Sequence, residues 1–182
     1  EFVEKLLLEI DKTAEIINDT GVYVENIYIG GGTPTTLSAD HFKLIFERMN
    51  SKMDLSKVIE FTVEAGRPDT IDKEKLQVLK NYGVNRISIN PQSMNDITLG
   101  KIGRSHNVDM IYKSYNLAKE IGFDVINMDL IAGLPDETPQ MFKDSLNKVI
   151  ELKPENITVH SLCIKSAAQF RHTKKELAKS ED

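Results

Sequence analysis

Two short stretches decide the fold class: Gly83-Val84-Asn85-Arg86-Ile87 and Gly122-Phe123-Asp124-Val125-Ile126. Each begins with a glycine directly after a helical pattern, at the position where a helix end favours a left-handed residue. Each then continues within two or three residues into a strand-like run. The two stretches look like copies of one helix-to-strand connection, which is typical of a parallel sheet built from strand–helix units.

Working outward, strand-like runs alternate with longer helical patterns along the whole chain. The expected strands are Asn26–Ile29, Val58–Glu64, Arg86–Asn90, Val125–Leu130 and Ile157–Leu162. Helices are expected near Ala39–Met53, Asp72–Tyr82, Val108–Ile121 and Pro139–Leu152, with a further helical pattern at the N-terminal end. Ser38 and Thr138 are suitable N-caps. The order predicts an α/β fold, a partial (β/α) TIM-like barrel with at least five parallel strands and right-handed crossovers, because a closed eightfold barrel needs about 250 residues.

Composition limits the classes of function. The 182 residues are 40% hydrophobic and 28% charged, with a net charge of −5, so one domain with a sizeable core is expected. The acidic balance disfavours a nucleic-acid partner, and no apolar run approaches the roughly 20 residues of a membrane span. The single cysteine, Cys163, excludes an internal disulfide and a four-thiolate metal site built from this chain. We therefore expect a cytoplasmic protein whose own residues bind no metal and which has no membrane partner.

Polar residues stand at the expected ends of successive strands, where ligands of parallel α/β barrels bind. They are the loop Gly30–Pro34, then Glu64, Gln92, Asp129 and Cys163. Parallel strands are normally apolar on both faces, so a polar side chain at the mouth of the barrel favours a ligand there. The alternative is that Glu64, Gln92 and Asp129 cap helices or pair with nearby arginines, namely Arg67, Arg86 and Arg104.

The glycine run allows positive φ and a close approach of backbone to a ligand. No Gly-Lys-Ser/Thr follows it, and the next helix begins late, so neither a phosphate loop nor a dinucleotide fingerprint is supported. A tight structural turn stays open as an alternative. His160 and Cys163 fall on opposite faces of one strand and are a poor metal pair, while Tyr28 is expected in the core or at the rim.

Three runs resemble one known family. They are Tyr28-Ile29-Gly30-Gly31-Gly32-Thr33-Pro34-Thr35, Ile89-Asn90-Pro91-Gln92-Ser93 and Asn127-Met128-Asp129-Leu130-Ile131-Ala132-Gly133-Leu134-Pro135. Together with Arg104, twelve residues after Gln92, they resemble the radical S-adenosylmethionine (SAM) enzymes of the oxygen-independent coproporphyrinogen III oxidase type. Val159–Lys165 is closer to the coproporphyrinogen dehydrogenase-like subgroup. The resemblance implies a radical SAM core over residues 1–170, followed by a polar tail over 171–182.

The resemblance also implies a chemistry. In the family, a 4Fe–4S cluster and SAM generate a radical that starts the oxidative decarboxylation of coproporphyrinogen III to protoporphyrinogen IX, with electrons from a donor. By resemblance, SAM is contacted by backbone groups of Gly31, Gly32, Thr33 and Cys163, and hydrogen-bonded by Glu64, Gln92 and Asp129. Arg104 would bind its carboxylate. The implied partners are a porphyrinogen substrate and an electron donor, and no catalytic residue is assigned.

One departure from the family pattern is large. The Cys-x-x-x-Cys-x-x-Cys run that holds the cluster would lie before residue 1, so we expect a truncated core that is inactive as it stands. Three other functions stay open: a haem carrier, another radical SAM enzyme such as a tRNA-modifying one, and a barrel enzyme that binds phosphate at the glycine run.

Overall fold

The computed structural model describes residues 1–162, and its centre is one parallel five-stranded sheet. Neighbours in sequence are neighbours in space, in the order β1 (Asn26–Ile29), β2 (Glu60–Ala65), β3 (Arg86–Gln92), β4 (Val125–Ala132) and β5 (Asn156–Ser161). All four pairings are parallel. The expected fold class, strand count and strand order are confirmed.

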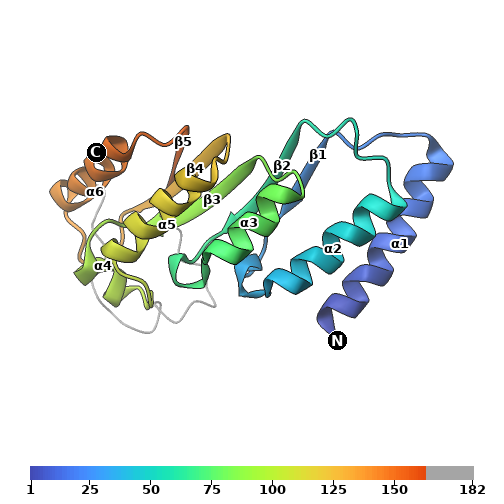
Figure 1. Cartoon of the computed structure of the whole chain (residues 1–182). Helices are drawn as coiled ribbons and strands as arrows, with labels where there is room; N and C mark the ends of the chain where they lie inside the picture. Colours follow the sequence, from blue (N-terminus) through green and yellow to red (C-terminus); the bar gives the residue numbers. More distant parts are fainter. Residues whose placement is uncertain (163–182) are drawn as a thin grey trace.

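The helices lie together in front of the strands in Figure 1. They are α1 (Phe2–Thr20), α2 (Ala39–Lys52), α3 (Lys73–Asn81), α4 (Asp96–Lys101), α5 (Val108–Ile121) and α6 (Pro139–Leu152), with two short 3-10 turns, η1 (Pro34–Thr36) and η2 (Pro68–Thr70). Helix α4 and the 3-10 turns are absent from the sequence prediction, because six or fewer residues carry too little periodicity to stand out. Helices α2, α3, α5 and α6 agree with their predicted bounds to within one residue, and α1 covers the helical pattern expected at the N-terminal end.

Helix ends follow the capping residues that the sequence offers. The Ser38 hydroxyl accepts a hydrogen bond from the backbone N–H of His41, and the Thr138 hydroxyl accepts one from that of Met141. Gly122, at the end of α5, has φ 86° and donates its N–H to carbonyls in the last turn of the helix. Gly83 has φ 89° in the matching place after α3. The repeated connection seen in the sequence is therefore a repeated connection in the structure.

A polar side chain just before β3, and another just before β5, hydrogen-bonds to the chain of the preceding strand. The Asn85 amide, just before β3, accepts from the Phe61 N–H at 2.9 Å and donates to the Ile59 carbonyl at 2.8 Å. Glu155, just before β5, accepts from the Ile126 N–H at 2.9 Å. These bonds help to fix β3 and β5 against their neighbours.

The two faces of the sheet differ in character. The residues that point toward the helices are buried and apolar: Phe61, Val63, Ile87, Ile89, Ile126, Met128 and Leu130. The alternate residues on the opposite face are polar along its length: Thr62, Glu64, Arg86, Ser88, Asn127, Asp129 and Thr158. The strands thus depart from the usual pattern of parallel sheets, which are apolar on both faces, because the described helices cover one face and a cavity lies on the other.

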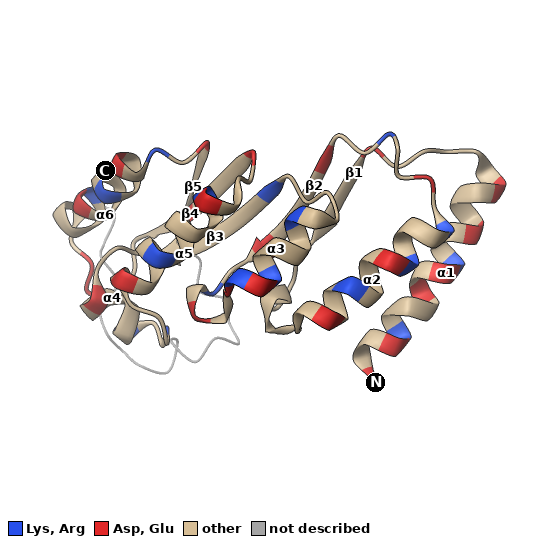
Figure 2. Cartoon of the chain, viewed as in Figure 1, with Lys and Arg blue, Asp and Glu red and all other residues tan. Residues whose placement is uncertain are grey.

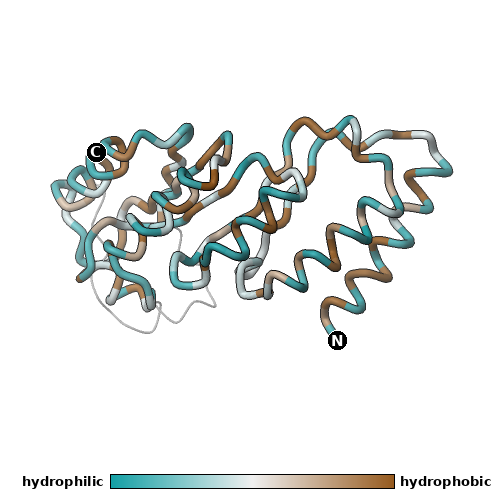
Figure 3. Tube along the Cα trace, viewed as in Figure 1, coloured by the Kyte–Doolittle hydropathy of each residue, from teal (hydrophilic) through white to brown (hydrophobic). Residues whose placement is uncertain are grey.

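Aromatic packing anchors α2 to the sheet. The Phe46 ring lies 5.7 Å from that of Phe42, 5.4 Å from that of Phe61 in an edge-on arrangement, and 5.3 Å from that of Tyr82. Figure 3 shows hydrophobic and hydrophilic residues alternating along α2 and α3, as expected for helices with one buried face. Phe46 thus joins α2, β2 and the end of α3 into one core.

Charge is dispersed over the helices rather than gathered in one block. Figure 2 shows Lys and Arg interspersed with Asp and Glu on their outer surfaces. Within residues 1–162, no helix has both the length and the hydropathy that crossing a bilayer requires.

The Phe46→Ala substitution should lower the free energy of unfolding by about 3–5 kcal/mol, because it leaves a cavity at the junction of three elements. The control is Leu44→Ala on the same helix, where 49% of the residue is exposed and the loss should stay below about 1 kcal/mol. Urea denaturation followed by circular dichroism measures both. Equal losses for the two variants would contradict this account of the core.

Candidate functional site

The glycine run after β1 is tied to β2 by Glu64. Gly31 and Gly32 have φ 83° and 58°, so both occupy the left-handed region that favours glycine. The Gly31 N–H donates to Glu64 Oε2 at 3.2 Å, and the Tyr28 hydroxyl donates to Glu64 Oε1. A Cβ at Gly30 would lie 2.3 Å from the Tyr28 ring and 3.2 Å from the Glu64 carboxyl carbon. The loop therefore depends on glycine to fit against this carboxylate.

Thr33 ends the glycine run and begins η1. Its carbonyl accepts from the backbone N–H of Thr36 at 3.0 Å and from the Thr36 hydroxyl at 2.8 Å. The turn is therefore held by its own hydrogen bonds. This agrees with a tight structural turn and also leaves Gly31 and Gly32 open, since a Cβ on either would meet nothing within 4 Å.

The open face of the sheet carries a cavity of about 340 Å³. Its lining is drawn from all five strands: Tyr28, Glu60, Thr62, Glu64, Arg86, Ser88, Asn127, Asp129, Thr158 and His160. The Asn127 side chain links several of these residues. It donates to Asp129 Oδ1 at 2.6 Å and to the Ser88 hydroxyl at 2.9 Å. The side-chain oxygen of Asn127, Oδ1, accepts from the Thr158 hydroxyl at 3.0 Å. These hydrogen bonds hold the Asp129 carboxylate in place on the open face of the sheet.

Three acidic residues line this cavity, Glu60 and Glu64 on β2 and Asp129 on β4. Glu60 is paired with Arg86 at 3.1 Å. His160 Nε2 lies 3.9 Å from Asp129 Oδ2. Desolvation raises the pKa of Tyr28 to about 12, and its hydrogen bond to Glu64 and the Glu64 charge act in the same direction. The Tyr28 phenol is therefore a neutral donor at physiological pH, which leaves the Glu64 carboxylate oriented toward the glycine turn.

Gln92 lies at an irregularity in β3. The register with β4 shifts between Ile89 and Gln92, and Gln92 has φ 68°, a strained value for a residue with a side chain. The residue is buried, and its Oε1 has no hydrogen-bond partner within the described residues. A buried amide oxygen without a partner costs about 1–3 kcal/mol, so this position favours a donor supplied by a ligand.

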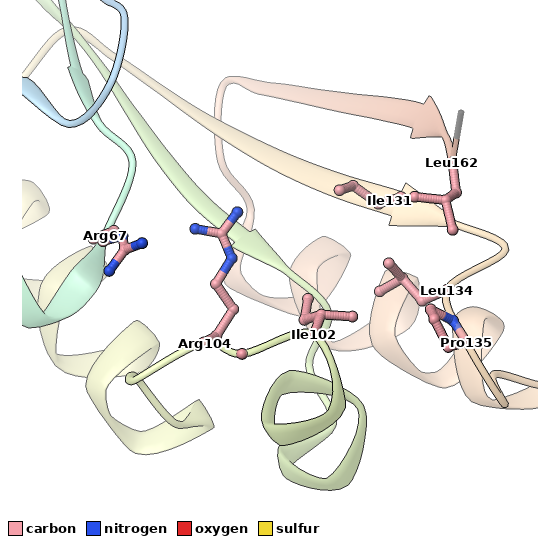
Figure 4. A pocket seen from close by; sticks show the side chains of 8 residues that line it. Arg67, Ile102, Arg104, Ile131, Leu134, Pro135 and Leu162 are labelled. Carbon is pink, nitrogen blue, oxygen red and sulfur yellow. The ribbon is translucent and has the colours of Figure 1, made fainter. Parts of the chain in front are cut away.

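Arg104 lines a second cavity, of about 300 Å³, at the carboxyl edge of the sheet. Arg67, Ile102, Gly103, Ile131, Leu134, Pro135 and Leu162 complete the lining, and Figure 4 shows the Arg67 and Arg104 guanidinium groups on the same side of it. Burial lowers the pKa of Arg104, the charge of Arg67 lowers it further, and Asp69 opposes both. Arg104 stays protonated in spite of this, as arginine does in proteins.

The structure places the predicted site residues in three groups. Gly31 and Glu64 are in contact, and Glu64 and Asp129 share the open-face cavity. Arg104 belongs to the second cavity, while Gln92 lines neither of these two cavities. Cys163 lies outside the described residues.

Two details of the prediction need correction. Strand β4 continues to Ala132, so Asp129 lies inside the strand and not at its end. The alternative in which Arg86 pairs with Glu64, Gln92 or Asp129 is also wrong. Arg86 pairs with Glu60 instead, at 3.1 Å. Glu64 instead accepts from the Gly31 backbone and from Tyr28.

Of the residues that line the open-face cavity, the sequence prediction named only Glu64 and Asp129 as site residues. It missed the other eight: Tyr28, Glu60, Thr62, Arg86, Ser88, Asn127, Thr158 and His160. A signal for them was available, since polar residues recur at every second position of four strands, for example Glu60, Thr62 and Glu64. A period of two places such residues on one face of a sheet. The prediction considered only the residues at strand ends and therefore missed this pattern within the strands.

Comparisons with known proteins agree with this geometry. Residues 2–149 match the family model described as "Radical SAM superfamily". The oxygen-independent coproporphyrinogen-III oxidase-like protein HemZ of Bacillus subtilis is 45% identical over 174 residues, which are 95% of this chain and 35% of that protein. The haem chaperone HemW of the same species is 40% identical, over 81% of this chain and 39% of that protein.

A solved structure of a related enzyme has the same fold as this chain. Coproporphyrinogen III oxidase HemN from Escherichia coli superimposes with a TM-score of 0.76 and 28% identity, over 87% of this chain and 37% of that one. The chain thus spans about a third of the length of these relatives. With a matching family model over most of its length and the parallel sheet of that fold, this chain belongs to the radical SAM superfamily.

Proposed function

We propose that residues 1–162 form the SAM-binding edge of a cytoplasmic radical SAM oxidoreductase that decarboxylates coproporphyrinogen III to protoporphyrinogen IX. The superfamily implies SAM and a 4Fe–4S cluster as cofactors. The observation that carries the proposal is the set of unmet polar groups along one edge of the sheet, where Gln92 Oε1 is buried without a partner. The substrate class rests on the similarity to the oxidase relatives.

The residues of this chain fit SAM. Half-buried Arg104 suits a carboxylate, because a guanidinium fork can donate two parallel hydrogen bonds. Gly31 and Gly32 are open enough for a ligand to reach their backbone, and the buried Gln92 oxygen needs a donor such as an amino or hydroxyl group. Glu64 and Asp129 supply further hydrogen-bond acceptors on the open face of the sheet. Residue 163 is proposed as a further backbone contact, and bound SAM supplies the radical chemistry of the family.

The described residues do not fit the cluster. Within residues 1–162, no group of three His, Cys, Asp or Glu side chains could hold a metal. The 182 residues contain one cysteine, whereas the family resemblance calls for three thiolates. What this chain contributes is the binding and orientation of SAM, with substrate and electron donor as the remaining partners.

The second candidate is a haem carrier, favoured by the 40% identity to a haem chaperone. The two functions differ in an observable product. Anaerobic assay of vinyl formation from coproporphyrinogen III, beside titration of haem into the same protein, separates them. Haem binding of one equivalent without vinyl formation would favour the carrier.

Arg104→Ala should weaken SAM binding to the intact, cluster-loaded protein by about 1.5–3 kcal/mol, the usual range for a hydrogen bond to a charged group. Isothermal titration calorimetry measures it. Lys57→Ala removes an exposed positive charge away from both cavities and should leave the affinity unchanged. If Arg104→Ala behaves like Lys57→Ala, Arg104 does not bind the cofactor.

The 182-residue chain by itself should form no cluster and cleave no SAM. Anaerobic reconstitution with iron and sulfide, followed by dithionite and SAM, tests this. Absorbance near 400 nm and 5′-deoxyadenosine are measured against a protein-free control. A stoichiometric cluster, or product above the control, would show that the residues present suffice.

Tyr28 should ionise at a higher pH than an ordinary tyrosine, in part because of its hydrogen bond to Glu64 and the Glu64 charge. Because its pKa of about 12 lies above the ordinary value of 10, the stability that its neutral form contributes is complete below pH 10 and is lost as the pH rises toward 12. The pKa values of Tyr82 and Tyr115 are raised as well, so Tyr28→Phe should reduce, by the share of one tyrosine, the high-pH step in absorbance at 295 nm. In Glu64→Gln this share of the step should move toward pH 10, and an unmoved share would contradict the Tyr28–Glu64 contact.

A further inference from the structure

Two cations share the cavity at the carboxyl edge of the sheet. Arg67 lies two residues after the end of β2, and Arg104 comes from the loop after α4, yet both line the same space of about 300 Å³. Figure 4 shows the two guanidinium groups pointing into it from neighbouring segments. SAM offers one carboxylate, so under the proposed function one of these two cations is left over.

The charges around the pair do not balance. Within residues 1–162, neither arginine has a carboxylate within ion-pair distance, whereas Arg86 pairs with Glu60 at 3.1 Å and Arg48 pairs with Asp11 at 2.6 Å. The acid that acts on Arg104 is Asp69, whose Oδ2 accepts from the Ser105 hydroxyl at 2.7 Å. Since two cations face one carboxylate that is already hydrogen-bonded, the cavity carries an excess of positive charge.

The neighbouring histidine does not change this balance. His106 is buried, its Nε2 lies 3.3 Å from the Pro91 carbonyl, and its Nδ1 is 4.0 Å from Asp69 Oδ1. Burial lowers the pKa of His106, and Arg104 and Arg67 lower it further. It is therefore neutral at physiological pH and neither adds to nor offsets the charge of the arginines.

The backbone of Arg67 is held in place. The Arg67 carbonyl accepts from the Thr70 N–H at 3.0 Å and from the Thr70 hydroxyl at 2.8 Å, and the next residue, Pro68, is buried. The Lys75 ammonium donates to the Thr70 carbonyl at 2.9 Å and to the Thr35 carbonyl at 3.0 Å, which links this turn to the glycine loop. Because the backbone of this turn is held in place, the Arg67 side chain enters the cavity from a fixed point.

The other wall of the cavity is apolar. Ile131 and Leu134 come from the end of β4 and the loop after it, and Leu162 follows β5. Figure 4 shows these side chains across the cavity from the arginines. A ligand that meets both walls must carry an anionic group on an apolar body.

We propose that Arg67 binds a carboxylate of the substrate, and so selects a flat or elongated apolar ligand with acidic side chains. The inference rests on the proposed function, in which Arg104 binds the carboxylate of SAM. The pair then serves two ligands side by side: Arg104 holds the cofactor, and Arg67 holds the substrate next to it, with the apolar body of the substrate against Ile131, Leu134 and Leu162.

The test measures binding of coproporphyrin III, a tetracarboxylate, and of its uncharged tetramethyl ester to the intact protein by the fluorescence of the porphyrin. Arg67→Ala should weaken binding of the acid about tenfold or more, equivalent to about 1.4 kcal/mol, and leave binding of the ester unchanged. Arg67→Lys should recover part of the loss. SAM affinity, measured separately, should stay within about twofold of wild type, and Lys57→Ala should change neither ligand.

Each other outcome counts against the proposal. Unchanged acid binding in Arg67→Ala, or an equal loss for acid and ester, means that Arg67 binds no substrate carboxylate. Loss of SAM affinity instead places both arginines on the cofactor. If the wild-type protein binds SAM but neither porphyrin, the proposed substrate class is wrong, and the assignment of Arg67 fails with it.

Discussion

Every feature of the candidate site depends on a sheet whose two faces have different chemistry. Apolar residues such as Val63, Ile87 and Met128 are fully buried against the helices, and this burial fixes the register of each strand, because a slip of one residue would exchange the faces. The polar residues that alternate with these apolar residues along each strand must then lie on the open face. Glu64 reaches the glycine turn, and Asp129 meets Asn127, as a consequence of how the core packs.

The sequence was a good guide where one physical rule dominates. Capping residues and helix-ending glycines set the helix bounds, as at Ser38 and Gly122, and the alternation of strands and helices set the parallel order. It was a poor guide where tertiary contacts decide. The bulge that turns Gln92 to positive φ, the reach of Tyr28 to Glu64 and the extension of β4 past Asp129 all depend on neighbouring strands, which no local pattern reports.

The candidate site combines rigidity with unmet polar groups. Tyr28, Glu64 and the glycine turn satisfy one another, and Asn127 satisfies the residues around Asp129. In contrast, Gln92 Oε1 has no partner, and two arginines face one cavity without a carboxylate at ion-pair distance within residues 1–162. Folding alone gives no reason to keep the Gln92 oxygen unpaired, because a buried amide oxygen without a partner has an energetic cost. A ligand that carries a carboxylate and hydrogen-bond donors accounts for both, and SAM is such a ligand.

The most direct test of this account is a crystal structure of the intact protein with its cluster and SAM bound. The account predicts that the carboxylate of SAM lies within hydrogen-bond distance of the Arg104 guanidinium. It also predicts a donor of the cofactor on Gln92 Oε1 and contact with the backbone of Gly31 and Gly32. A cofactor bound away from this edge, with Gln92 Oε1 still unpartnered and Arg104 free, would contradict it.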